Sequence, residues 1–219
     1  MRYNDEGEFE CESTQRWRTG VRISGGGARG VTLVVPAGDA VRPATDGLRQ
    51  AVFSSLAQRT PDSHVLDLFA GSGAYGLEAL SRGATHAVFV ERHAKTAGFI
   101  ARNVEAVAKS LGRGPRELAK VVVSDALAWT PTPGDTAPDL IFIDPPYDQI
   151  QSLASTLLTR VSAWVSAVHD PLILFETPGE ISLQLPGWSA IKRIGGQTPR
   201  QPGVTVFRRD LPASDPARA

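Results

Sequence analysis

Several features that would narrow the class of this protein are scarce in its 219 residues. The single cysteine, Cys11, excludes an internal disulfide. No apolar run approaches the roughly 20 residues of a membrane-spanning helix, and the acidic N-terminus does not resemble a signal peptide. The four histidines lack ligand spacing and a cysteine partner, so we expect no metal site. These absences predict a soluble, cytoplasmic protein.

An excess of charge is also lacking, because 23 basic and 23 acidic residues cancel. Their distribution is uneven: residues 1–15 have a net charge of −4, whereas residues 16–59 contain seven arginines and two aspartates. We interpret 1–15 as a disordered acidic tail and 16–60 as an extension that binds phosphate groups. An ordinary solvated surface is the alternative interpretation of the arginines.

Residues 61–210 have the pattern of an α/β domain. Short apolar runs of strand length alternate with helical segments, which is typical of a doubly wound parallel sheet with helices on both faces. We expect strands at 65–69, 87–90, 121–123, 140–143 and 172–175, and helices at 74–81, 95–111 and 153–168.

The two ends of the chain differ from this pattern. Residues 190–194 and 204–207 predict a final antiparallel pair of strands, and 211–219 a second disordered tail. Upstream, residues 21–35 predict a hairpin with a glycine-rich turn, and Thr45-Asp46 predicts the capped start of a helix.

Four successive predicted strands end in an acidic residue, at the edge where parallel sheets bind ligands. The loop from Asp67 to Gly73 offers N–H groups for a carboxylate and Asp67 for an ammonium, which suits the methionine half of S-adenosylmethionine. Glu91 suits the ribose hydroxyls, and by analogy with the fold Asp125 suits the adenine amine. The predicted donor-binding residues are Asp67, Phe69, Ala70, Gly71, Ser72, Gly73, Glu91, Arg92, Asp125 and Ala126.

The same loop has competing interpretations. Gly71 to Gly76 matches the dinucleotide fingerprint G-x-G-x-x-G, and Glu91 follows Gly71 by 20 residues, as in a nicotinamide oxidoreductase. A glycine-rich turn without a ligand is the third interpretation. Asp67 would repel a pyrophosphate, however, and the rest of the chain offers little for hydride transfer, so S-adenosylmethionine is favoured.

The most specific signal follows the fourth strand, where Asp144-Pro145-Pro146-Tyr147 stands. Consecutive prolines fix φ and remove N–H donors, which leaves rigid carbonyl acceptors. The Asp144 carboxylate and the Pro145 carbonyl can hold the two N–H groups of a nucleobase amine and direct its lone pair. Tyr147 offers a face on which the base stacks. We predict all four as catalytic residues; an ordinary turn is the alternative interpretation.

Several segments resemble the RsmD family of RNA methyltransferases. Arg22-Ile-Ser-Gly-Gly and Ala28-Arg29-Gly30 are similar to the family's opening hairpin, and Arg42 to Gln50 is similar to its R-P-T-x-D segment. The long match that begins Asp67-Leu-Phe-Ala-Gly-Ser-Gly and the match at Asp144-Pro-Pro-Tyr complete the resemblance, which spans residues 22–209.

The resemblance implies a Rossmann-like class I methyltransferase with a seven-stranded, mostly parallel sheet, an antiparallel last strand and an N-terminal hairpin-and-helix extension. It implies transfer of a methyl group from S-adenosylmethionine to N2 of a guanine in bacterial small-subunit (16S) ribosomal RNA, as part of rRNA processing and ribosome biogenesis. The substrate would be ribosomal RNA or an assembly intermediate of the small subunit, and the enzyme a monomer. The predicted RNA contacts are Arg22, Arg29, Arg42, Thr45 and Arg49.

Ala44, Gly47 and Gln50 depart from the family pattern, and all three lie in the extension. Two other functions are compatible with the same motifs. A DNA adenine or cytosine amino-methyltransferase shares Asp144-Pro-Pro-Tyr, although an extension of about 60 residues is small for readout of the major groove. A non-catalytic RNA-binding module that kept the fold is the other.

Overall fold

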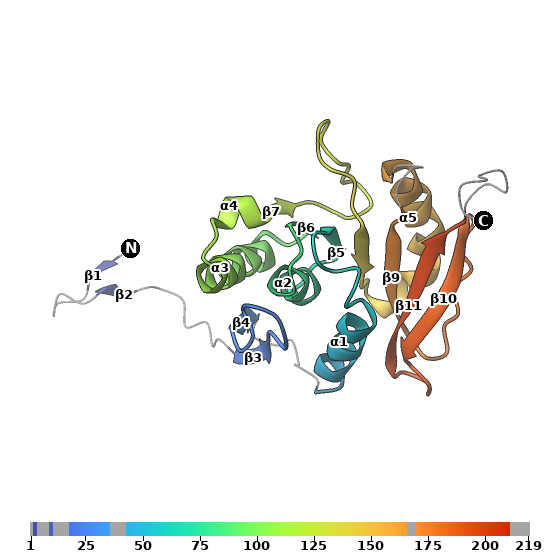
Figure 1. Cartoon of the computed structure of the whole chain (residues 1–219), viewed down its shortest axis with the longest axis horizontal. Coiled ribbons are helices and arrows are strands. Elements are labelled where there is room, and N and C mark those ends of the chain that lie inside the picture. The colour runs from blue at the N-terminus through green and yellow to red at the C-terminus, as the bar shows by residue number, and fades with distance from the viewer. Residues whose placement is uncertain (1, 4–8, 11–17, 36–42, 166–169, 211–219) are drawn as a thin grey trace.

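The computed structural model describes residues 2–3, 9–10, 18–35, 43–165 and 170–210. A seven-stranded sheet lies at its centre (Figure 1). Its strands are β5 (His64–Leu68), β6 (His86–Glu91), β7 (Ala119–Val123), β8 (Leu140–Ile143), β9 (Leu172–Pro178), β10 (Trp188–Gly195) and β11 (Pro202–Arg209).

The strand order is β10-β11-β9-β8-β5-β6-β7. Strands β5 to β9 pair in parallel, whereas β11 is antiparallel to both β9 and β10. The predicted sheet with an antiparallel last strand is thereby confirmed. The order reverses between β5 and β8, and ligands bind at such a switch point in open α/β sheets.

Helices cover both faces of the sheet (Figure 1). Alternate residues of a strand point to opposite faces, so Val65, Phe142 and Leu174 join one buried cluster while Ile143 and Phe175 join another. The first cluster includes residues of α1, α2 and α3, and the second those of α5. None of the described helices has the length and hydropathy of a membrane span. The helices are α1 (Pro43–Ser55), α2 (Ala74–Ser81), α3 (Ala94–Leu111), α4 (Pro115–Leu118) and α5 (Ile150–Trp164), with a 3-10 turn, η1 (Tyr147–Gln149).

The predicted N-terminal hairpin is present as β3 (Arg18–Arg22) and β4 (Thr32–Val35), which pair antiparallel. Its glycine-rich turn packs on the end of α2, where the Gly27 N–H donates to the Ser81 carbonyl at 2.7 Å. Gly26 has a φ of 79°, and a Cβ there would collide with the Ser81 carbonyl. The turn therefore needs glycine both for its backbone conformation and for this close approach.

Several predicted boundaries are corrected. Helix α1 begins at Pro43 instead of Thr45, because proline is compatible with the first turn of a helix. Helix α5 runs from Ile150 to Trp164, so it starts and ends earlier than predicted. Strand β9 continues to Pro178. Within the predicted acidic tail, Arg2–Tyr3 (β1) and Phe9–Glu10 (β2) form a short antiparallel pair, and the other residues of 1–15 lie outside the described ranges.

Candidate active site

A cavity of 580 Å³ opens at the carboxyl edge of the sheet. It collects residues that follow β5, β6, β7 and β8, which are far apart in the sequence but end at the same edge. The predicted residues on its wall are Phe69, Glu91, Arg92, Asp125, Ala126, Asp144, Pro145, Pro146 and Tyr147. Val90, His93, Ser124, Leu127, Gln149 and Leu153 also line it and were not predicted, although most are sequence neighbours of the strand-end acids.

The loop after β5 coils tightly before α2 begins. Phe69, Gly71 and Gly73 have φ values of 62°, 54° and 78°, so three of five consecutive residues are left-handed. The Gly71 N–H donates to Glu91 Oε2 at 3.1 Å, which ties the loop to the end of β6. The His93 N–H donates to Glu91 Oε1 at 2.8 Å. Both carboxylate oxygens are thus held in place, and each keeps a second lone pair for a ligand.

Asp67 lies under this loop with 3% of its surface exposed. It accepts a hydrogen bond from the Gly76 N–H at 3.0 Å. Burial raises the pKa of Asp67 to about 7; the Gly76 bond opposes the rise and the charge of Glu91 adds to it. Position 76 requires glycine because a Cβ there would collide with the Phe89 ring.

The remaining predicted donor contacts are placed around the cavity without lining it. Ala70, Gly71, Ser72 and Gly73 of the loop and Asp67 of β5 are not part of the cavity wall, so their contact with the donor stays a prediction.

Asp125, by contrast, is exposed at the cavity wall, and its Oδ1 accepts the Leu127 N–H at 2.7 Å. This bond orients a carboxylate at the edge of the cavity.

Asp144 borders the cavity between β8 and η1. Desolvation raises its pKa well above the ordinary value, and the negative charges of Glu176 and Asp67 raise it further. Asp144 is itself an exposed residue at the cavity wall, so its surroundings are those of a cleft and not of a sealed core. The next two prolines lead into η1, where the Gln149 N–H donates to the Pro146 carbonyl at 3.0 Å.

Two residues at the site were missed, Tyr75 and Glu176. Glu176 lies on β9, is 6% exposed, and accepts a hydrogen bond from Tyr75 Oη at 2.8 Å and one from Tyr147 Oη at 3.4 Å. Burial raises the pKa of Glu176, and the two tyrosine hydroxyls partly offset this. The sequence carried a signal for Glu176, since it directly follows the predicted strand 172–175 as the other acids follow theirs.

The structure corrects the predicted RNA contact at Arg49. This arginine is 3% exposed, and its guanidinium pairs with Asp46 at 2.9 Å and with Glu78 at 3.4 Å. It also donates to the Arg22 carbonyl at 2.7 Å. Arg49 therefore ties α1 to α2 and to the hairpin, and its charge is neutralised inside the protein.

The other predicted RNA-binding residues stay predictions. Arg22 and Arg29 are exposed on the hairpin, whereas Arg42 lies outside the described residues and the side chain of Thr45 is not described. Arg29 belongs to the turn beside the C-terminal end of α2, about one helix length from the loop after β5 at the other end of α2.

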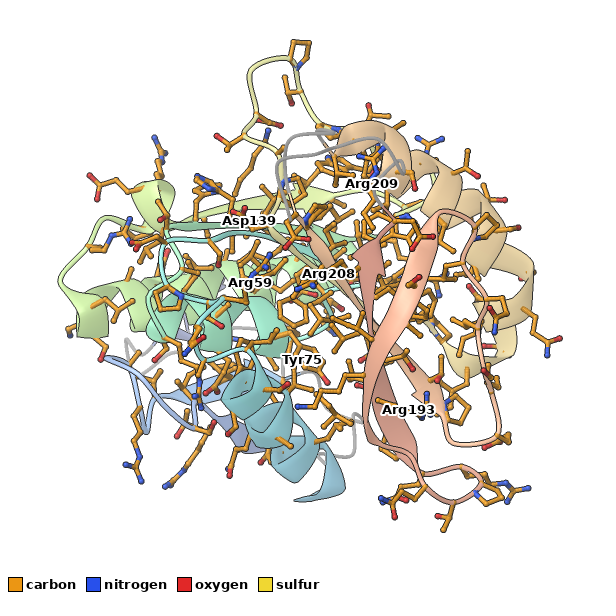
Figure 2. All side chains as sticks on the ribbon, turned by 45° about the vertical axis from the view of Figure 1, so that its right-hand side comes forward. Arg59, Tyr75, Asp139, Arg193, Arg208 and Arg209 are labelled. Carbon is orange, nitrogen blue, oxygen red and sulfur yellow. The ribbon has the colours of Figure 1, made fainter. Side chains whose placement is uncertain are left out.

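A further arginine of the basic stretch is also paired. Arg59 and Arg208 lie close together in Figure 2, and both contact the Asp170 carboxylate, at 2.9 and 3.4 Å. The charge of the extension is therefore less available to a polyanion than the sequence predicts.

Residues 21–199 match the family model described as "Conserved hypothetical protein 95". Ribosomal RNA small subunit methyltransferase D of Escherichia coli K12 is 38% identical over 163 residues, which cover 74% of this chain and 77% of that protein. The chain belongs to the RsmD family.

Solved structures agree with this membership. The structure described as "putative methyltransferase yhhF from Escherichia coli" superposes with a TM-score of 0.68 at 30% identity, covering 88% of this chain and 99% of that one. A "putative methyltransferase complexed with SAH" has a TM-score of 0.64 at 14% identity, covering 92% of this chain and 58% of that one, and so shows a shared fold only. The predicted class I methyltransferase fold is confirmed, and with it the family prediction.

Proposed function

We propose that this protein transfers a methyl group from S-adenosylmethionine to the exocyclic N2 amine of a guanine in bacterial small-subunit ribosomal RNA. One observation carries the proposal: Asp144-Pro145-Pro146-Tyr147 lines the same cavity as Glu91 and Asp125. The predicted amine-binding residues thus share a cavity with Glu91 and Asp125, the residues predicted for the ribose and the adenine of the donor. Ribosomal RNA is the proposed substrate because the E. coli relative is named a ribosomal RNA small subunit methyltransferase and its match covers most of this chain.

The residues present fit such a donor. The cavity of 580 Å³ is in the range of roughly 300–1,000 Å³ that is usual for small-molecule sites. Glu91 is held by two backbone N–H groups with lone pairs to spare for a ribose, and Asp125 stands exposed at the wall for the adenine amine. When bound, S-adenosylmethionine supplies an electrophilic methyl group.

On the acceptor side, the chain's own residues hold the amine. The Asp144 carboxylate and the Pro145 carbonyl accept its two N–H groups, and the ring of Tyr147 stacks on the base. Asp144 stabilises positive charge that grows on the nitrogen and takes no proton before attack. This role needs the ionised carboxylate. Because the pKa of Asp144 is raised, that form requires a higher pH than an ordinary aspartate does.

The test uses labelled S-adenosylmethionine with small-subunit ribosomal RNA, free and in assembly intermediates, followed by digestion and identification of the nucleoside. We expect N2-methylguanosine with the natural chain and at least a hundredfold loss with Asp144→Asn, as for removal of one stabilising group in other active sites (about 10²–10³-fold). Binding of S-adenosylhomocysteine should persist in this variant. Methylation of duplex DNA in place of RNA would contradict the proposal, and so would a label on any other nucleoside.

A further inference from the structure

Glu176 is a buried acid that the methyl-transfer scheme above does not use. It is the only charged residue of β9, whose seven residues are all buried. A buried carboxylate is costly unless it is hydrogen-bonded. Here both oxygens are used, Oε2 by the Tyr75 hydroxyl and Oε1 by the Tyr147 hydroxyl.

The register of the sheet brings Glu176 beside Asp144. Ile143 of β8 pairs with Phe175 of β9, and each is followed directly by one of the two acids. Tyr147 begins the turn three residues after Asp144, lines the cavity and is 38% exposed. Glu176 thus contacts the predicted stacking residue on one side and lies next to the amine-binding carboxylate on the other.

Tyr75 anchors Glu176 from the side opposite Tyr147's cavity. Its ring stacks on Phe142 with centroids 5.0 Å apart and lies 6.5 Å from Phe53 of α1. Tyr75 is partly buried, and Figure 2 shows it beside α1. The Tyr75 hydroxyl bond to Glu176 is the shorter of the two, at 2.8 Å against 3.4 Å for Tyr147. A rigid aromatic stack therefore fixes the carboxylate, and the carboxylate in turn holds the exposed ring.

We propose that Glu176 is a positioning residue for methyl transfer: held by Tyr75, it fixes the ring of Tyr147 at the cavity wall, where the target base stacks. This role rests on the proposed function, because Tyr147 is assigned to the base there. Displacements of about 1 Å at a reacting centre can cost a hundredfold in rate. A tether on the stacking ring is a direct way to prevent them.

The electrostatic surroundings of Glu176 give the role a second signature. Facing it are Tyr75 from α2, Tyr147 from η1 and Asp144 after β8, with Asp67 of β5 beyond Asp144. Arg49 of α1 acts on Tyr75, and Arg193 of β10 donates to Thr177 and Pro178. Neutralising Glu176 removes a charge that raises the pKa of Asp144, so the acid limb of the kcat/KM profile should move to lower pH.

The test is a double-mutant cycle of Glu176→Gln and Tyr147→Phe, measured on whichever RNA nucleoside the natural enzyme methylates. At a pH above the acid limb, where the Asp144 shift has no effect, we expect about a tenfold loss of kcat in each single variant and about the same loss in the double variant, because both changes break one tether. The Kd for S-adenosylhomocysteine should stay within about twofold. Multiplicative losses near a hundredfold, or no loss in Glu176→Gln, would overturn the proposal.

A second measurement needs no substrate. In donor-free protein labelled at tyrosine ¹³Cζ, Glu176→Gln should shift the resonances of Tyr147 and Tyr75. The variants Tyr147→Phe and Tyr75→Phe assign these two resonances. The exposed control Glu105→Gln should leave both unchanged. A Tyr147 resonance that does not move in the folded Glu176→Gln variant would refute the tether. If the cycle and the spectra support the tether but the product is not N2-methylguanosine, the guanine assignment fails and the role of Glu176 stands.

Discussion

Replacing Glu78 with glutamine should weaken the attachment of the N-terminal hairpin to α1 and α2 and so destabilise the protein. Glu78 lies in α2 and is fully buried. Its Oε2 accepts the Ser24 N–H at 2.8 Å, and its Oε1 accepts the Ser24 hydroxyl at 2.6 Å and Arg82 Nε at 2.7 Å. Arg49 adds a longer contact of 3.4 Å. One carboxylate therefore joins the hairpin, α1 and the end of α2.

The expected cost follows from what remains after the change. Removing one partner of a buried ion pair typically costs about 3–5 kcal/mol, because the other charge is left without compensation. Here Arg49 keeps Asp46 and the Arg22 carbonyl, and Arg82 is partly exposed to water. We therefore expect the lower end of that range, about 3 kcal/mol, in the free energy of unfolding.

Urea unfolding of Glu78→Gln against the natural chain measures this loss, with the exposed helical Glu105→Gln as a control that should change stability by less than about 0.5 kcal/mol. Hydrogen bonds to the charged form hold the pKa of Glu78 below its ordinary 4.5 despite burial. The stabilisation is therefore present above pH 4.5 and is lost as the pH falls through the folded-state pKa. A loss below about 1 kcal/mol at pH 7 would refute the reasoning.

Three further predictions concern the loop after β5 and the proposed RNA-binding surface. Gly76→Ala should lower both the stability of the protein and its affinity for S-adenosylhomocysteine, because the added Cβ collides with the buried Phe89 ring. Gly98→Ala, with open space around it, should stabilise the protein by about 0.5–1 kcal/mol. Urea unfolding measures the two stabilities, and calorimetry measures the affinity. Folding raises the pKa of Asp67 from 3.8 to about 7, so the ligand-free protein should lose stability as the pH rises between these two values. Asp67→Asn should flatten that part of the stability profile. Arg29→Ala should reduce the slope of log RNA affinity against log salt by about one, with Arg116→Ala as the exposed control; an unchanged slope would remove Arg29 from the RNA surface.

The sequence by itself determined the sheet and the edge where the site lies. Apolar runs of strand length fix which segments are buried on both faces, and an acid directly after a run is placed at the strand end whatever the rest of the chain does. Asp67, Glu91, Asp125 and Asp144 could therefore be assigned to one edge before any tertiary contact was known. The glycine-rich hairpin turn could also be predicted from the sequence, because its backbone conformation is a local property.

Tertiary structure alone decided which of those charges are available. Arg49 reads as a surface cation in sequence, but α2 brings Glu78 against it from 29 residues away. Glu176 reads as one more strand-end acid until the β8–β9 register sets it beside Asp144 and two tyrosines take up its oxygens. Burial and Coulomb energies depend on distances between segments that local patterns do not contain, and those distances separate a charge that binds a ligand from one that holds the fold together.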